Sequence, residues 1–101
     1  MRMIVDIVIP HEPFNSLVRS GEVGALLQKV IEHCKPESIY FTEENGSRGG
    51  VMIVDVADQS QVPYYAEPWF LSFEADCRFR VAMTPEDLGN AGLDALGQKF
   101  G

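Results

Sequence analysis

The sequence has few of the features that mark a particular chemistry. It contains only two cysteines, Cys34 and Cys77, and no Cys-x-x-Cys or His-x-x-x-His spacing. Metal centres and disulfide frameworks both need such clusters of ligands or paired thiols. Each cysteine also falls in phase with apolar neighbours, as buried thiols do. We therefore expect two buried free thiols in a reducing cytoplasm, no metal site and no cofactor.

Basic residues are scarce as well. Eight Lys and Arg residues stand against fifteen Asp and Glu residues, which gives a net charge of −7. A negative chain repels the phosphate groups of nucleic acids, and neutralisation of those phosphates by basic residues drives most nucleic-acid binding. The only apolar run near the start of the chain is interrupted by Asp6 and lacks a small-residue cleavage site. We expect a cytoplasmic protein that binds neither nucleic acid nor membrane.

The composition is otherwise that of a soluble globular domain. Hydrophobic residues make up 46% of the chain and charged residues 23%, with no internal repeat and no linker. We therefore expect one domain over residues 1–101. A chain of this size buries only about two thirds of its unfolded surface when it folds alone. Association with a second copy is expected for that reason.

The hydrophobic periodicity predicts an α+β domain in the order β-α-β-β-α-β. Strand patterns cover residues 2–9, 37–42, 50–56 and 77–83, and helical spacing covers 14–35 and 58–73. Gly21 is the point at which the first helix can divide. The Asn45-Gly46 pair favours a tight hairpin turn between the middle strands. Residues after Thr84 form a short C-terminal helix or extension, weakened by three glycines.

This element order favours a ferredoxin-like antiparallel sheet in the order 4-1-3-2, with both helices on one face. Parity within residues 2–9 assigns Met3, Val5, Ile7 and Ile9 to the covered face. The other face is left open, and it collects aliphatic residues together with Tyr40 and four charged side chains. These four are Asp6, Asp55, Arg78 and Arg80. We expect Asp6 to lie near Arg78 or Arg80, and Asp55 near Arg2.

The element order over essentially the whole chain, and above all the segment "AEPWFLSFEADCRFRVAMT", resembles the dimeric α+β barrel superfamily. The segments "KPESIYFTEENGSRGGVMIVDVAD" and "MTPEDL" resemble those of an uncharacterised family of bacterial proteins. The resemblance implies a homodimer in which two ferredoxin-like protomers press their open sheet faces together. It implies no single reaction, because the superfamily includes cofactor-free monooxygenases, isomerases, haem-degrading enzymes and proteins without known activity. A fold shared this widely does not define a function.

Several residues are candidates for a site, although each also has a structural explanation. Asp6, Asp55, Arg78 and Arg80 can bind an anionic ligand, or they can simply pair with one another. His11 is a candidate general base, oriented by Glu12 or Glu43, or else an ordinary surface residue. Tyr40 is a second catalytic candidate on the open face. Trp69 is a candidate ligand contact, although its helical spacing with Tyr65, Phe70 and Phe73 places it first in the core.

Two functions of different classes follow from these residues. The first is a non-catalytic binding or assembly protein, in which the polar residues hold a homodimer together. The second is a small-molecule enzyme of the cofactor-free monooxygenase or isomerase type, acting on a small anionic or aromatic compound. The segment "SRGG", residues 47–50, is no phosphate loop, because a strand rather than a helix follows it.

Overall fold

The structure is a computed structural model that describes all 101 residues. It is an α+β fold built on one four-stranded antiparallel sheet. The central strand β1 (Arg2–Ile9) pairs with β3 (Ser47–Asp55) on one side and with β4 (Asp76–Val81) on the other. β2 (Ser38–Glu44) pairs with the far side of β3. The order β2-β3-β1-β4 is the predicted 4-1-3-2 order read from the opposite side, and it is compatible with a ferredoxin-like fold.

Alternating side chains of β1 form the centre of the core. Met3, Val5, Ile7 and Ile9 are buried, whereas the residues between them are only partly covered. Successive side chains of a strand point to opposite faces, so this alternation requires that packing elements cover one face only. The predicted assignment of β1 residues to the two faces is confirmed.

The hairpin between β2 and β3 turns on two residues. Asn45 and Gly46 have positive φ angles of 49° and 83°, which the mirror-image turns of tight hairpins require and which glycine and asparagine adopt most readily. The Glu43 carboxylate accepts a hydrogen bond from the Gly46 amide at 2.9 Å. Both strands continue to this turn, so the hairpin is longer than the predicted 37–42 and 50–56.

The helical region predicted over residues 14–35 is divided into two helices. α1 (His11–Ser20) ends at Gly21, whose φ of 80° gives the left-handed cap typical of glycine, and α2 (Val23–Cys34) follows. The predicted division at Gly21 is confirmed. The helical segment begins earlier than predicted, at His11, although Glu12 within it has an extended backbone.

The third helix carries the largest core side chains. A short 3-10 turn, η1 (Gln59–Gln61), capped by Asp58, leads into α3 (Val62–Phe73). Trp69 and Phe73 are fully buried, with ring centroids 5.9 Å apart. Phe70 was also expected in the core, but this is wrong, because it is 37% exposed. Only the narrow side of α3 that carries Ala66, Trp69 and Phe73 reaches the sheet.

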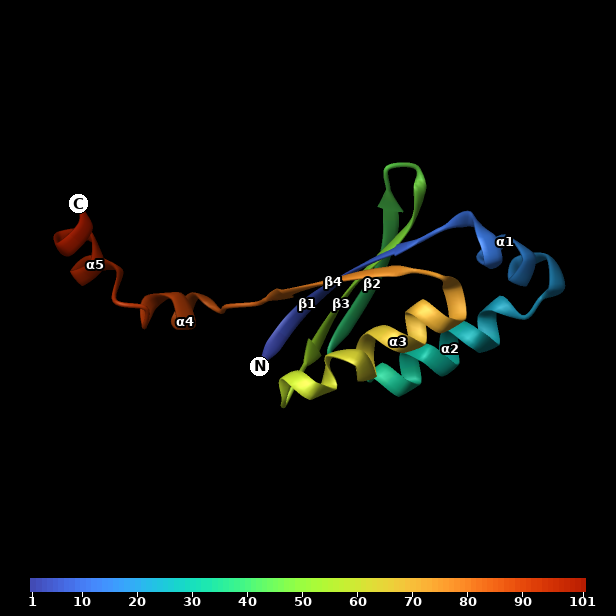
Figure 1. Cartoon of the computed structure of the whole chain (residues 1–101), viewed down its shortest axis with the longest axis horizontal. Coiled ribbons are helices and arrows are strands. Elements are labelled where there is room, and N and C mark those ends of the chain that lie inside the picture. Colours follow the sequence, from blue (N-terminus) through green and yellow to red (C-terminus); the bar gives the residue numbers. More distant parts are fainter.

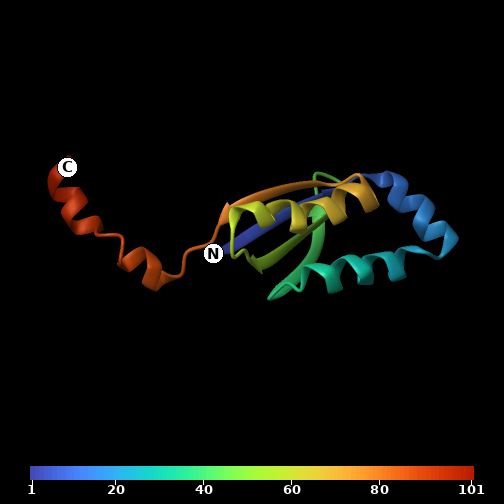
Figure 2. The same cartoon turned by 60° about the horizontal axis from the view of Figure 1, so that its bottom comes forward.

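The helices leave one face of the sheet bare. Figures 1 and 2 show α2 and α3 side by side on the same side of the sheet, with α1 at its far end. The bare side, which we call the open face, carries the β1 residues between the buried ones. None of the helices is both long and apolar enough to cross a membrane.

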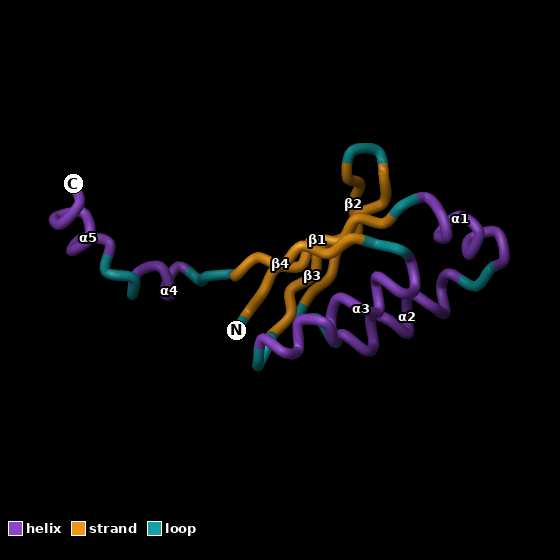
Figure 3. The backbone as a smooth tube through the Cα atoms, viewed as in Figure 1, coloured by secondary structure: helices purple, strands orange, loops and turns teal.

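Residues 84–101, which we call the C-terminal arm, lead away from the rest of the chain. The arm contains α4 (Pro85–Gly89) and α5 (Leu93–Phe100), separated by residues 90–92 (Figure 3). The Thr84 hydroxyl and the Asp87 carboxylate cap α4 reciprocally, with bonds of 3.0 and 2.9 Å. The radius of gyration of 17.2 Å exceeds the roughly 13 Å of a compact 100-residue domain. The arm accounts for this elongation.

The core assignment predicts unequal effects for two large residues of α3. Replacing Phe73 with alanine removes a fully buried ring and leaves a cavity, so we expect the free energy of unfolding to fall by about 3–5 kcal/mol. Leu71 is 79% exposed, and Leu71→Ala should change it by less than about 0.5 kcal/mol. Urea denaturation measures both values. Similar losses in the two variants would contradict this placement of α3.

Candidate functional site

The open face carries an ion pair at its centre. Asp6 lies directly across from Arg78 in the register of β1 and β4, but the side chain that reaches it is Arg80. The Arg80 Nε atom donates a hydrogen bond to Asp6 Oδ2 at 2.8 Å. The two side chains lie diagonally across neighbouring strands, where long side chains still meet. The expected proximity of Asp6 to these arginines is confirmed.

Arg78 has no ion-pair partner, although Asp6 is close by. It lines an open groove of about 540 Å³ together with Asp6, Phe79 and Arg80. Two guanidinium groups and one carboxylate line this groove, and Arg78 also lines a neighbouring groove that carries Asp6, Glu44 and Asp76. A guanidinium binds carboxylate or phosphate oxygens through two parallel hydrogen bonds. The groove is therefore suited to an anionic group, which a ligand or another protein surface can supply.

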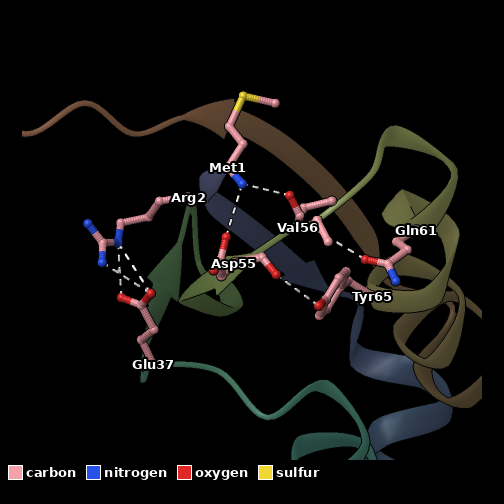
Figure 4. Close-up of polar contacts among 8 residues, drawn as sticks. Met1, Arg2, Glu37, Asp55, Val56, Gln61 and Tyr65 are labelled. Atoms are coloured by element: carbon pink, nitrogen blue, oxygen red, sulfur yellow. Dashed lines mark hydrogen bonds and ion pairs between the residues drawn. The ribbon is translucent and has the colours of Figure 1, made fainter. Parts of the chain in front are cut away.

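A second set of polar contacts lies where β1 begins (Figure 4). The N-terminal amine of Met1 donates to Asp55 Oδ1 at 3.0 Å, and the Tyr65 hydroxyl donates to the Asp55 backbone carbonyl at 3.2 Å. Arg2 lies opposite Asp55 in the register, as expected, but its ion pair is with Glu37. The hydrogen bond and charge of Glu37 raise the pKa of Arg2 above its usual value. Asp55 is thus held by the chain terminus rather than by Arg2.

The two candidate catalytic residues are placed apart from each other and from the ion pair. Tyr40 is 68% exposed on the open face of β2, and His11 is exposed at the start of α1. No hydrogen bond joins either side chain to another residue. Glu12, expected to orient His11, instead accepts hydrogen bonds from Ser16, and these lower its pKa. Glu43 caps the hairpin turn, so the structure contains no histidine–carboxylate pair at this point.

Trp69 lies in the core rather than at a ligand surface. Its side chain is fully buried, and its ring packs against Phe73 at the centre of the hydrophobic cluster. A ligand on the open face is separated from Trp69 by the thickness of the sheet. The helical spacing that assigned Trp69 to the core was therefore the better guide to its position.

A contact between α2 and α3 was not predicted. The rings of His33 and Tyr64 stack with centroids 4.0 Å apart. The His33 Nε2 atom lies 3.0 Å from the Tyr64 carbonyl, and the Tyr64 hydroxyl donates to the His33 carbonyl at 3.2 Å. Each side chain therefore contacts a backbone carbonyl of the other residue. This contact explains the positions of both side chains without a catalytic role.

Arg48 was not predicted as a candidate site residue, although its parity along β3 indicates that it lies on the helix-covered face. It shares the parity of the buried residues Met52 and Val54, so its side chain leaves the strand on the helix-covered face. Its guanidinium carbon lies 4.3 Å from the centroid of the Phe14 ring, within the range of a cation–π contact. Its Nη1 atom is buried without a hydrogen-bond partner.

Both cysteines are free thiols on the helix-covered side of the sheet, Cys34 buried and Cys77 partly so. Burial disfavours the charged thiolate, so it raises the pKa of Cys34 and raises that of Cys77 to about 12. Thiolates are the reactive form of cysteine, which makes both residues poor nucleophiles near neutral pH. No group of three or more His, Cys, Asp or Glu side chains is placed to hold a metal ion.

No protein-family model matches the chain, and no curated protein matches it. Similarity to a protein of known activity therefore assigns no role to the residues described above.

The raised thiol pKa predicts a loss of stability at alkaline pH. Above about pH 9 the unfolded chain releases the Cys77 proton, whereas the folded chain retains it up to about pH 12. The folded state then binds more protons, so the free energy of unfolding falls as pH rises. Urea denaturation measures the free energy of unfolding at pH 8 and at pH 10.5. Between these pH values it should fall by about 1 kcal/mol less in Cys77→Ala than in the wild type, a figure that allows for partial exposure of the thiol. Equal falls would contradict this origin.

Proposed function

We propose that this protein is a non-catalytic binding or assembly protein that works as a homodimer, with the open sheet faces of two copies in contact. The observation that carries this proposal is the bare face of the sheet. A half-covered sheet on a small domain exposes apolar area that a second copy can bury. A two-fold interface of this kind uses the same patch on both partners.

The apolar part of the open face supports a protein partner. Ile4, Val8, Val51 and Ile53 are only partly covered, and they lie on the two adjacent strands β1 and β3, where Ile4 is opposite Ile53. Tyr40 adds an exposed aromatic ring on β2. Contiguous exposed apolar residues with a polar rim are typical of interaction surfaces, and tyrosine is enriched where such surfaces bind.

The charges of the open face also favour contact between two copies. The whole chain has a net charge of −7, so two copies repel each other at most orientations. The charged residues with open-face parity nearly balance, however, since three are basic and four are acidic. They are Arg2, Arg78, Arg80, Asp6, Glu44, Asp55 and Asp76. This face is therefore the one on which two acidic chains can meet with least repulsion, and the unpaired Arg78 can gain a partner there.

The C-terminal arm offers the dimer a second contact. It exposes Leu88, Leu93, Leu96 and Phe100 on helices of only five and eight residues. Helices this short are not stable in water unless they pack against another surface. The arm extends beyond its own sheet (Figure 1), so a second copy is the surface that would bury its apolar side.

One observation favours an enzyme as the second candidate. The groove around Arg78 and Arg80 is open and lined by two guanidinium groups, as a site for a small anionic or aromatic substrate requires. Tyr40 and His11 would then act as the groups that transfer protons. This function needs the partner copy or a bound substrate to bring these residues together, because they are not assembled within one chain.

The dimer predicts a measured mass of twice the 11.2 kDa chain in static light scattering at micromolar concentration. Ile53→Glu places a carboxylate on the open face, where it would be buried without a partner, and should give the monomer mass. Leu71→Glu makes the same change on the outside of α3 and should leave the dimer intact. A monomeric wild type, or a dimer broken only by Leu71→Glu, would overturn the proposed interface.

Deletion of residues 84–101 separates the contribution of the arm from that of the sheet. The deletion should leave the core folded, because no arm residue is buried. We expect the dimer dissociation constant, measured by analytical ultracentrifugation, to rise by at least about tenfold, since a tenfold change corresponds to the loss of only a small apolar contact. An unchanged constant would remove the arm from the interface while leaving the sheet contact in place.

A further inference from the structure

A small pocket lies on the helix-covered side of the sheet, away from the open face. It has a volume of about 200 Å³ and is bounded by the end of β1, by α1 and α2, and by the β2–β3 hairpin. Its apolar walls are Ile9, Phe14, Leu27 and Phe41, and Arg48 is the one charged residue that lines it. The pocket is thus an apolar space with a single cation in its wall.

Arg48 is held in this pocket without an acidic partner. In the sheet it lies between Ile9 on β1 and Glu43 on β2. Glu43 is the nearest carboxylate in the register, but it accepts the amide hydrogen bond of Gly46 instead. No ion pair forms at Arg48, and its Nη1 atom is buried with no hydrogen-bond acceptor. Buried donors are normally satisfied, so an unfilled one calls for an explanation.

The aromatic walls fix the position of this cation. The guanidinium carbon lies over the Phe14 ring, 4.3 Å from the ring centroid, which is close enough for a cation–π contact. Phe41 lies opposite Gly50 across the hairpin, and its ring atoms come within 3.4 Å of the place where a Gly50 side chain would begin. One planar donor group and two rings are therefore presented to the same small space.

We propose that this pocket binds a small organic monocarboxylate that carries one ring or a short alkyl chain. The carboxylate would pair with the part of the Arg48 guanidinium that lines the pocket, and the apolar body would lie between Phe14, Phe41 and Leu27. A guanidinium and a carboxylate match in geometry and charge. A cavity of about 150 Å³ holds benzene, so a 200 Å³ pocket fits a single ring with its acid group.

The lining argues against other classes of anion. Phosphate esters and dicarboxylates carry more charge than one guanidinium can neutralise, and burying the excess is costly. The pocket is lined by no second basic residue. The site is also independent of the proposed dimer, because it lies on the opposite side of the sheet from the open face.

The test uses benzoate as the probe, with benzamide and acetate as matched comparisons. Benzamide has the same shape without the charge, and acetate has the charge without the ring. Titration of ¹⁵N-labelled protein at constant ionic strength should give saturable shifts for the amides of Phe41, Arg48 and Gly49. We expect a dissociation constant for benzoate on the order of 1 mM, at least about fivefold weaker binding of benzamide, and weaker binding still of acetate.

Two arginine variants assign the effect. Arg48→Gln should remove the preference for benzoate over benzamide, whereas Arg19→Gln, which alters an exposed arginine of α1, should leave it unchanged. Equal affinity for the acid and the amide in the wild type would overturn the proposal, whether or not Arg48→Gln folds. Shifts confined to Arg78 and Arg80, on the open face, would overturn it as well. If the wild type is monomeric but still binds benzoate more tightly than benzamide, the proposed dimer is wrong and the proposed binding site is supported.

Discussion

Burial of the sheet on one side only is the constraint on which the rest of the structure depends. Val5 and Ile7 in the centre of β1 pack against Trp69 and Phe73, and no element of the chain covers the other face. Because side chains alternate along a strand, this arrangement commits half of each strand to packing. The remaining half is free to carry charge, and it is there that Asp6 and Arg80 pair.

The alternation of residues also explains how much could be predicted from the sequence. The strict alternation in β1, together with Asn45-Gly46, was enough to predict the buried face and the position of the hairpin. Helical spacing predicted which side of α3 faces the core but not how narrow the buried side is. Phe70 was therefore wrongly assigned to the core. Arg48 was not predicted as a site residue because a charged side chain is expected to be exposed to solvent. Its parity with Met52, however, indicated that it lies on the helix-covered face. The pairing of Arg2 with Glu37 depends on contacts between distant segments, which no local pattern contains.

The two faces of the sheet hold their arginines in different ways. Arg80 lies in a solvent-exposed groove and forms an ion pair with Asp6. An exposed ion pair contributes little to stability in water. Arg48 lies over an aromatic ring beneath the hairpin, where water has less access and an ion pair with a ligand is worth more. The open face is therefore better suited to contact over a large area, and the covered face to selective binding of one small molecule.

The C-terminal arm affects how the molecule moves through solution. The chain measures 60 × 29 × 19 Å along its principal axes, and at a given mass an elongated shape has more friction with solvent than a compact one. A monomer with an extended arm would diffuse as slowly as a heavier compact protein and elute early from a sizing column. Packing of the arm onto a neighbour would reduce friction per unit mass, so assembly and compaction would occur in the same step.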